Sequence, residues 1–570
     1  MTPDQEALNY VQGRLVGLRI NRFSWWTHWR ELADYFLPRR YKWVVTPNQM
    51  NRGSPINAHI VNSHGVICAR NLASGLVSGK SSPTRPWFKL RVGTFDSTMT
   101  SPISLWLGEC ERILYLIFSQ SNFYNSIAQF YFDLVVFGTA TMLIYEDFEN
   151  VINCIVPCAG EYYIDIDGRY RPTIFYREFT MTAAQIVDEF GYENCSTVVR
   201  SLFDDQNGAN RTRELIVGHA IEPNNDGRRF GVPTRFPFRE FYWEWGGSAS
   251  PQGSNYQPQG FLRKRGFFTM PNITCRWDIV SNDAYGRSPG MDALPDQKQL
   301  QLEERRKAQA IDKMVNPPLV ADYQLKTQPA SLLPGGITYV NGFTTSGRPG
   351  IASIYQTQFP VGDITQDIEQ VKARLTRIFF NDVLMTASQY ETRSNVTAIE
   401  WDMRKSESLV ALGPALDRID YEALSPIIDR VFDIALRAGI LPPPPQEFGG
   451  QMITVNYISI LQQAQQAASS AGIERLLTMA GNLLAAKPEI MDNIDTDYAL
   501  NKYSALLNND HRIIKSPEEV QAIREQRAQQ QQQQMAAQQL LAMSQAGKNL
   551  SQTDVGGGVN AIQAMGGVAP

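Results

Sequence analysis

Apolar residues near the start of the chain recur at the spacing of one helical face. The spacing of four, three and four is carried by Trp25, Trp29, Leu32 and Phe36. Residues 4–43 are therefore predicted to form a helix that turns at Pro38. Basic residues surround this stripe, namely Arg14, Arg19, Arg22, Arg30, Arg39, Arg40 and Lys42. Basic and aromatic side chains together can contact nucleic acid, but a packed helix with a solvated opposite face is the favoured interpretation.

The rest of the first half mixes helical and strand patterns. Helices are predicted over residues 56–79, 101–135 and 181–203, and strands over 86–92, 138–180 and 213–285. Residues 130–145 form the longest apolar run, but Asp133 and the Gly138-Thr139 break indicate a buried helix that enters a strand. Asp167-Gly168 indicates a hairpin turn. Antiparallel hairpins without a βαβ repeat predict an α+β fold.

The second half is predominantly helical. Residues 295–313 predict a polar helix without a broad apolar face, and residues 361–380 predict a second helix. A narrow apolar seam runs along the second helix, through Ile364, Ile368, Val371, Leu375 and Ile378. A long amphipathic helix begins at Val396, and kinks are expected at Pro414 and Pro426.

Short patterns surround these helices. Residues 316–360 are rich in proline and glycine with short strand-prone runs, and residues 386–395 are polar without an apolar period. A strand is predicted over residues 453–460. Residues 461–545 predict helices rich in Ala, Gln and Leu, with a glutamine run at 529–534 and a flexible end at 556–558.

Composition narrows the function classes. Among 570 residues, 53 are basic and 57 acidic, so the net charge is −4 and the chain lacks the basic footprint of a tight DNA binder. Only 19% of residues are charged, which suits a protein that covers surface against copies of itself. No apolar run reaches the ~18 residues of a membrane span. The six cysteines are scattered and predict buried, reduced thiols, although Cys154 and Cys158 form a CxxxC.

Two motifs resemble sites of known chemistry. SGLVSGKS at residues 74–81 is one residue from a P-loop, but a helix is predicted before it, and Pro83 and Pro86 do not suit the helix that should follow. IDIDGRY at 164–170 resembles part of a calcium loop, but a hairpin turn explains it better. We therefore expect no catalytic residue, no metal and no cofactor.

Three segments resemble the head-to-tail connector, or portal, proteins of short-tailed bacteriophages. They are NLASGLVSGKSSPTRPWFKL at 71–90, YGRSPGMDALPDQKQL at 285–300, and residues 392–445. The third segment is the most specific, with TAIE at 397–400, LGP at 412–414 and GILPPPP at its end. The likeness covers most of the chain and is weakest before residue 50 and after residue 465.

The resemblance implies an α+β portal fold that assembles as a cyclic ring, usually of twelve subunits, at one capsid vertex. The implied parts are a wing (1–283), stem helix 1 (284–313), a clip (314–360), stem helix 2 (361–383), a channel loop (384–395), a wing helix and strand (396–460), crown helices (461–525) and a C-terminal helical barrel or tail (526–570). Double-stranded DNA is packaged and ejected through the channel.

The implied partners are further copies of the chain, the terminase large subunit, a head-completion or tail adaptor protein, the major capsid and scaffolding proteins, and DNA held non-specifically, with no membrane. The protein is expected to be made in the host bacterial cytoplasm and to reside in the virion.

Candidate contact residues follow from the same resemblance. The DNA-channel loop candidates are Gln389, Tyr390, Glu391, Thr392, Arg393, Ser394 and Asn395. The candidates to face the channel from the stem are Lys298, Arg305, Lys372 and Arg374. The clip candidates for docking a partner are Tyr323, Lys326, Tyr339, Phe343 and Arg348.

Charge counts agree with a weakly attractive channel. Residues 295–313 hold five basic and four acidic side chains, a net of +1, and residues 361–380 balance three against three. Such a wall holds DNA weakly, because each neutralised phosphate adds salt-dependent affinity. Two alternatives remain at this point: a tail or baseplate adaptor without a DNA channel, and a P-loop-like packaging ATPase.

Overall fold

The computed structural model describes residues 3–40, 59–92, 102–225, 230–245, 260–315, 319–321, 351–353, 360–382, 412–446, 453–457, 476, 478–479, 495–500 and 517–552. The chain divides into two units. The first unit comprises Met1–Phe88, Ile113–Leu441 and Tyr457–Ala464, and the second comprises Lys89–Arg112, Pro442–Asn456 and Gln465–Pro570.

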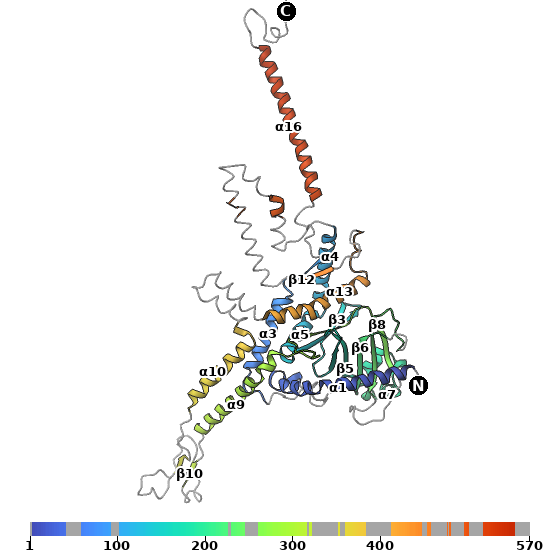
Figure 1. Cartoon of the computed structure of the whole chain (residues 1–570), viewed down its shortest axis with the longest axis vertical. Coiled ribbons are helices and arrows are strands. Elements are labelled where there is room, and N and C mark those ends of the chain that lie inside the picture. Colours follow the sequence, from blue (N-terminus) through green and yellow to red (C-terminus); the bar gives the residue numbers. More distant parts are fainter. Residues whose placement is uncertain are drawn as a thin grey trace, which may run out of the picture. The chain divides into compact units, whose positions relative to one another are not determined.

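A five-stranded antiparallel sheet forms part of the first unit (Figure 1). Its order is β4 (Tyr162–Ile166), β5 (Pro172–Thr182), β6 (Glu214–Pro223), β7 (Phe238–Trp245) and β8 (Phe261–Phe267). The expected hairpin at Asp167-Gly168 is confirmed, since it joins β4 to β5. There the Asp167 carboxylate accepts the backbone N–H groups of Arg169 and Arg171, which is a turn and not a calcium loop.

Each face of this sheet packs against helices, because successive strand residues point to opposite sides. Helix α1 (Pro3–Phe36) packs on the face that carries Ala220, Phe241 and Trp243. Helices α6 (Ala183–Phe190) and α7 (Thr197–Phe203) pack on the face that carries Val217 and Tyr242. Short 3₁₀ turns lie at Pro38–Arg40, Tyr192–Asn194 and Ala209–Thr212.

Helix α1 confirms the packed interpretation of the aromatic stripe, but its arginines do not all form a solvated face. Trp29, Leu32 and Phe36 are buried. Arg19 pairs with Glu178 at 2.5 Å, and the Arg22 guanidinium donates to the carbonyl oxygens of residues 160 and 162 at 2.9 and 2.7 Å. These partners lie far away in the sequence, so a helical pattern alone could not reveal them.

A second, three-stranded sheet has the order β3 (Val151–Ile155), β2 (Thr139–Asp147) and β9 (Asn272–Arg276). Helix α5 (Phe123–Phe137) leads directly into β2, which confirms the expected buried helix entering a strand. Gly138 at the junction has φ 76°, a conformation that favours glycine. A Cβ at this position would also collide with the Gly286 carbonyl, so the close approach requires glycine as well. Helix α3 (His64–Lys80) packs against α5 and begins later than the predicted residue 56.

Two long helices of the first unit confirm the helical prediction for residues 295–313 and 361–380. They are α9 (Pro289–Val315), which begins earlier than expected, and α10 (Val361–Ile378). Between them in sequence, β10 (Leu319–Ala321) pairs antiparallel with β11 (Ile351–Ser353).

The long helix near residue 420 has a π-turn directly before Pro426, one of the two positions where a kink is expected. Residues 412–419 are α-helical, and the helix continues through this π-turn, η7 (Asp420–Leu424), into α13 (Ser425–Arg437). Pro426 lacks an N–H group and its ring crowds the carbonyl of Glu422 four residues earlier. A widened turn accommodates this without ending the helix. Residues 396–411 lie outside the described part.

The second unit contains β1 (Phe88–Val92), which pairs with β12 (Ile453–Tyr457), and the first part of α4 (Pro102–Gln120). The helical region predicted over 101–135 contains two helices, α4 and α5 (Phe123–Phe137), separated at Ser121 and Asn122. Glu111 of α4 accepts the Leu90 N–H at 2.6 Å. Residues 496–500 are helical, and the glutamine run lies in α16 (Pro517–Gln552), whose described side chains are almost all exposed.

Candidate functional site

Helix α9 begins at a well-defined cap on the body of the first unit. The Ser288 hydroxyl accepts the Met291 N–H at 3.0 Å and donates to the Val136 carbonyl at 2.7 Å. Pro289 follows at the first helical position, where its missing N–H costs nothing. Gly290 allows close approach to α5, since a Cβ there would lie 2.8 Å from the Val136 oxygen.

Two buried glutamines then fasten α9 to its neighbours. Gln301 Oε1 accepts the N–H groups of Val61 and Asn62 at 2.7 and 2.8 Å, and its Nε2 donates to the Asn62 carbonyl at 2.8 Å. Gln297 Nε2 donates to the Tyr35 carbonyl at 3.2 Å. Although α9 is polar in composition, one of its faces is buried and is held by hydrogen bonds between glutamine side-chain amides and backbone groups.

Helix α10 lies alongside α9 (Figure 1) and confirms the apolar seam. Ile368, Val371 and Leu375 are buried. The end of α10 reaches α1 and α3: the rings of Phe36 and Phe379 are 5.6 Å apart, and His64 Nε2 lies 3.1 Å from Thr376 Oγ1. Contacts with α1 and α3, or with the residues next to them, therefore hold the C-terminal end of α10 and the N-terminal half of α9.

The stem candidates carry charges that are mostly neutralised within the chain. Lys298 pairs with Glu31 at 2.8 Å, Lys372 with Glu369 at 2.7 Å, and Arg374 with Asp296 at 3.0 Å. Arg305 is exposed. These pairs contribute little stability, because exposed ion pairs are worth about 0–1 kcal/mol, but they lower the field that this helix pair presents.

The far half of α9 exposes apolar side chains on a helix that is otherwise polar. They are Leu302, Ile311, Met314 and Val315, each at least 43% exposed. Exposed apolar side chains of this kind are typical of a surface that contacts another molecule.

The other predicted contact residues are not described. The channel-loop candidates, residues 389–395, and the clip candidates Tyr323, Lys326, Tyr339, Phe343 and Arg348 lie outside the described residues. Their roles stay predictions.

The P-loop interpretation is wrong. SGLVSGK forms the last turns of α3, so the motif is itself helical and follows no strand. Lys80 is buried and its ammonium pairs with Asp420 at 2.7 Å. A phosphate-binding lysine needs free access and helix N–H groups ahead of it, and this lysine has neither.

A buried polar cluster in the five-stranded sheet escaped the sequence analysis. Arg177 Nε donates to His219 Nδ1 at 3.0 Å, and His219 Nε2 lies 2.8 Å from Glu240 Oε1. Burial lowers the pKa of His219 to about 4. The pKa of Glu240 is lowered to about 2, against its burial, by the hydrogen bond from His219 and by the charge of Arg265. Both side chains are fully buried, so the cluster is structural. Only the strand register, which places β6 beside β7, brings these residues together.

The remaining chemistry is limited in the part of the chain that the structure describes. All six cysteines are buried and unpaired, as predicted, and burial raises the pKa of Cys154 and of Cys158 to about 12. No group of three or more metal-ligating side chains occurs among the described residues. None of the described helices combines the length and the hydropathy that crossing a membrane requires.

Comparison with known proteins identifies the class. Residues 9–514 match the family of bacteriophage head to tail connecting proteins, and the chain belongs to that family. The resemblance inferred from three segments is thereby confirmed over nearly the whole length.

Two relatives cover almost the whole chain. It is 36% identical over 530 residues to a probable portal protein of Bordetella phage BPP-1, spanning 92% of each chain. It is also 36% identical over 543 residues to the portal protein of Salmonella phage epsilon15, spanning 95% of this chain and 94% of the relative.

Proposed function

We propose that this protein is the portal of a tailed phage: a ring at one capsid vertex through which double-stranded DNA is packaged and later ejected. The family match over residues 9–514 carries the proposal. The proposal assigns the chain a structural role with no catalytic step, metal or cofactor, and places it in the virion after synthesis in the host bacterial cytoplasm.

The paired helices α9 and α10 are the proposed stem of each subunit. Copies side by side, usually twelve, would enclose a channel with these helices on its wall. Two observations support this: the exposed apolar residues on the far half of α9, which neighbouring copies would cover, and the internal ion pairs of Lys298, Lys372 and Arg374. A wall whose net charge is close to zero lets a duplex slide, since phosphate contacts add affinity in proportion to their number.

The remaining segments take their roles from this arrangement. We assign residues 1–283 and 396–460 to a wing, 314–360 to a clip, 384–395 to a channel loop, 461–525 to a crown and 526–570 to a helical barrel or tail. The clip would dock the terminase large subunit during packaging and the adaptor protein afterwards, while the wing would meet the major capsid and scaffolding proteins.

A tail or baseplate adaptor without a DNA path is the competing function. Zero-length cross-linking of packaged DNA in filled particles separates the two. A portal should give peptide–DNA adducts within residues 389–395, and changing Arg393→Ala should reduce them. The matched control, Arg211→Ala, alters an exposed arginine in a 3₁₀ turn of the first unit and should leave the yield unchanged. Filled particles whose DNA never cross-links to this chain contradict the proposal.

A further inference from the structure

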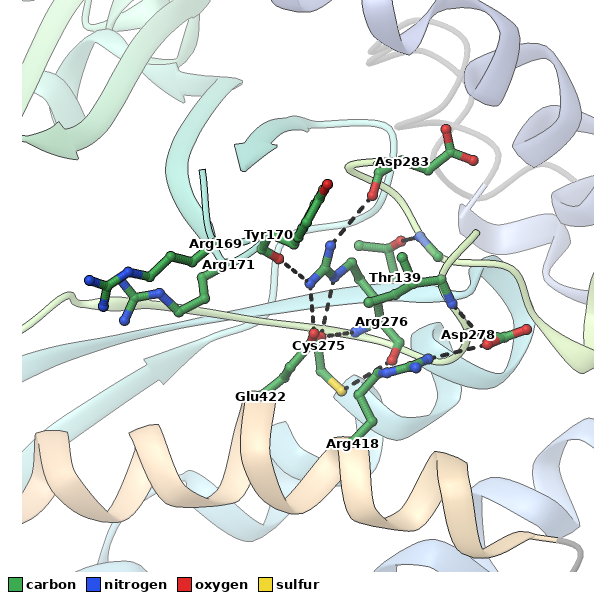
Figure 2. Close-up of polar contacts among 12 residues, drawn as sticks. Thr139, Arg169, Tyr170, Arg171, Cys275, Arg276, Asp278, Asp283, Arg418 and Glu422 are labelled. Carbon is green, nitrogen blue, oxygen red and sulfur yellow. Dashed lines mark hydrogen bonds and ion pairs between the residues drawn. The ribbon is translucent and has the colours of Figure 1, made fainter. Parts of the chain in front are cut away.

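The guanidinium of Arg276, at the end of β9, joins three separate segments of the first unit (Figure 2). Its Nη2 donates to Glu422 Oε1 at 2.7 Å and to the Tyr170 carbonyl at 2.7 Å, and its Nη1 donates to the Asp283 carbonyl at 3.4 Å. The Arg276 backbone N–H also donates to Glu422 Oε2 at 3.0 Å. Both side chains are removed from solvent, with Arg276 2% and Glu422 9% exposed.

These three segments occupy distinct places in the chain. Tyr170 is at the tip of the β4–β5 hairpin, where its φ of 61° is uncommon for a residue with a side chain. Asp283 belongs to the loop of residues 277–288 that leads into α9. Glu422 belongs to the π-turn within the helical residues 412–437, which we call the returning helix.

The Arg276 side chain therefore connects β9 both to the loop that leads into α9 and to the returning helix. A second, weaker tie runs parallel to it: Arg418 Nη1 donates to the Trp277 carbonyl at 3.0 Å and lies 3.3 Å from Asp278 Oδ1. Asp278 is largely exposed, so this pair is the more easily broken of the two.

The π-turn is one residue wider than an α-helical turn. Ser425 N–H bonds to the Asp420 carbonyl five residues earlier, whereas an α-helix uses the residue four earlier. Two buried ion pairs connect the turn to different elements. Asp420 pairs with Lys80 of α3, and Glu422 pairs with Arg276 of β9. Neither carboxylate can leave its partner without stranding a buried charge.

We propose that Arg276 is a positioning residue that couples the loop entering α9 to the π-turn of the returning helix, so that neither moves without the other. This inference rests on the proposed function, which identifies α9 as part of the stem and the returning helix as part of the wing. The geometry requires a planar cation with several donors, since a lysine has no fork with which to reach Glu422, Tyr170 and Asp283 together.

Hydrogen exchange on the purified, assembled protein tests the coupling without DNA. In Glu422→Gln, we expect amides of the π-turn and of residues 277–288 to exchange together, each roughly a hundredfold faster than in the unchanged protein. Amides of β6 and β7 should keep their rates. Arg276→Lys, which preserves the charge, should give the same joint pattern at smaller amplitude.

The control is Arg418→Ala, which removes the exposed tie and should change exchange by less than about fivefold. Acceleration confined to residues 420–424 in Glu422→Gln, with 277–288 unchanged, overturns the proposal, as does uniform acceleration over β6 and β7. A monomeric protein with the joint pattern would contradict the ring and leave the coupling standing, so the two failures are distinguishable.

Discussion

The five-stranded sheet and the α9–α10 pair use charged residues in opposite ways. In the sheet, Arg239 and Glu222 form an ion pair in which each side chain is 3% exposed. On the helices, Arg374 and Asp296 pair at 3.0 Å with 43% and 21% exposure. A buried pair specifies one geometry, because losing one partner leaves the other charge buried without compensation. An exposed pair reduces the electrostatic potential of the surface and contributes little to stability.

This difference fits the proposed roles of the two regions. We expect a wing to keep one shape and a channel wall to stay weakly attractive to DNA. The same side-chain chemistry therefore serves stability in one place and electrostatic neutrality in the other. Changing either kind of pair should reveal which role it has.

The largest effect is expected in the sheet. Glu222→Gln removes the carboxylate that Arg239 Nε contacts at 2.8 Å and weakens the bond from the Tyr176 hydroxyl at 2.9 Å. We expect the free energy of unfolding to fall by about 3–5 kcal/mol, measured by urea denaturation. Glu189→Gln removes the exposed partner of Arg263 and should cost less than about 1 kcal/mol. Equal losses in the two variants would show that burial does not separate these pairs.

Acid should weaken the sheet through His219. Its pKa is lowered from 6.5 to about 4 in the folded protein, so between these values the unfolded chain binds more protons. Stability from this group is complete above pH 6.5 and declines as the pH falls toward 4, by on the order of 3 kcal/mol. Urea titrations between pH 7 and 4 measure the slope, and His219→Gln should remove that component. An unchanged slope in the variant would assign the pH dependence to other groups.

An intermediate effect is expected where α9 meets the body. Gln301→Ala leaves the N–H groups of Val61 and Asn62 without their acceptor. A loss of about 1–3 kcal/mol is expected, because buried donors are stranded, and hydrogen exchange should show faster opening of α9 around residue 301. The matched control is Gln309→Ala, an exposed glutamine of the same helix. If both variants open equally, the glutamine anchor is not what holds α9.

The smallest structural effect is expected on the helix surfaces. Asp296→Asn removes the carboxylate that neutralises Arg374, whose guanidinium still donates to Gln299, and should change the free energy of unfolding by less than about 1 kcal/mol. The uncompensated cation should nevertheless retain DNA more strongly, so ejection from assembled particles should slow at low salt and recover at high salt. Ejection that is slowed equally at all salt concentrations would argue against an electrostatic origin.

The sequence predicted the features that depend on local pattern. The seam of α10, the junction of α5 with β2 and the turn at Asp167 all follow from spacing or from glycine chemistry, and all were confirmed. Helix α9 was predicted as polar, but the anchoring role of Gln301 depends on residues 61 and 62, far away in the chain. Periodicity contains no information about such a partner.

The features that the sequence did not predict have the same origin. Pro426 predicted a kink but not the π-turn before it, whose carboxylates pair with Lys80 and Arg276 from distant parts of the chain. The arginines of α1 were assigned to solvent because partners such as the Glu178 carboxylate and the Tyr162 carbonyl belong to strands more than a hundred residues away. The candidate contact residues between 384 and 395 and in the clip lie outside the described part and remain predictions.

The central claim is that many copies of this chain stand side by side around an open channel. Averaged end-on images of the purified particle by electron cryomicroscopy test it most directly. The account predicts a closed ring whose central opening admits a DNA duplex, with helical density on its wall. Isolated subunits at high concentration, or a ring whose centre is filled by packed helices, would contradict it.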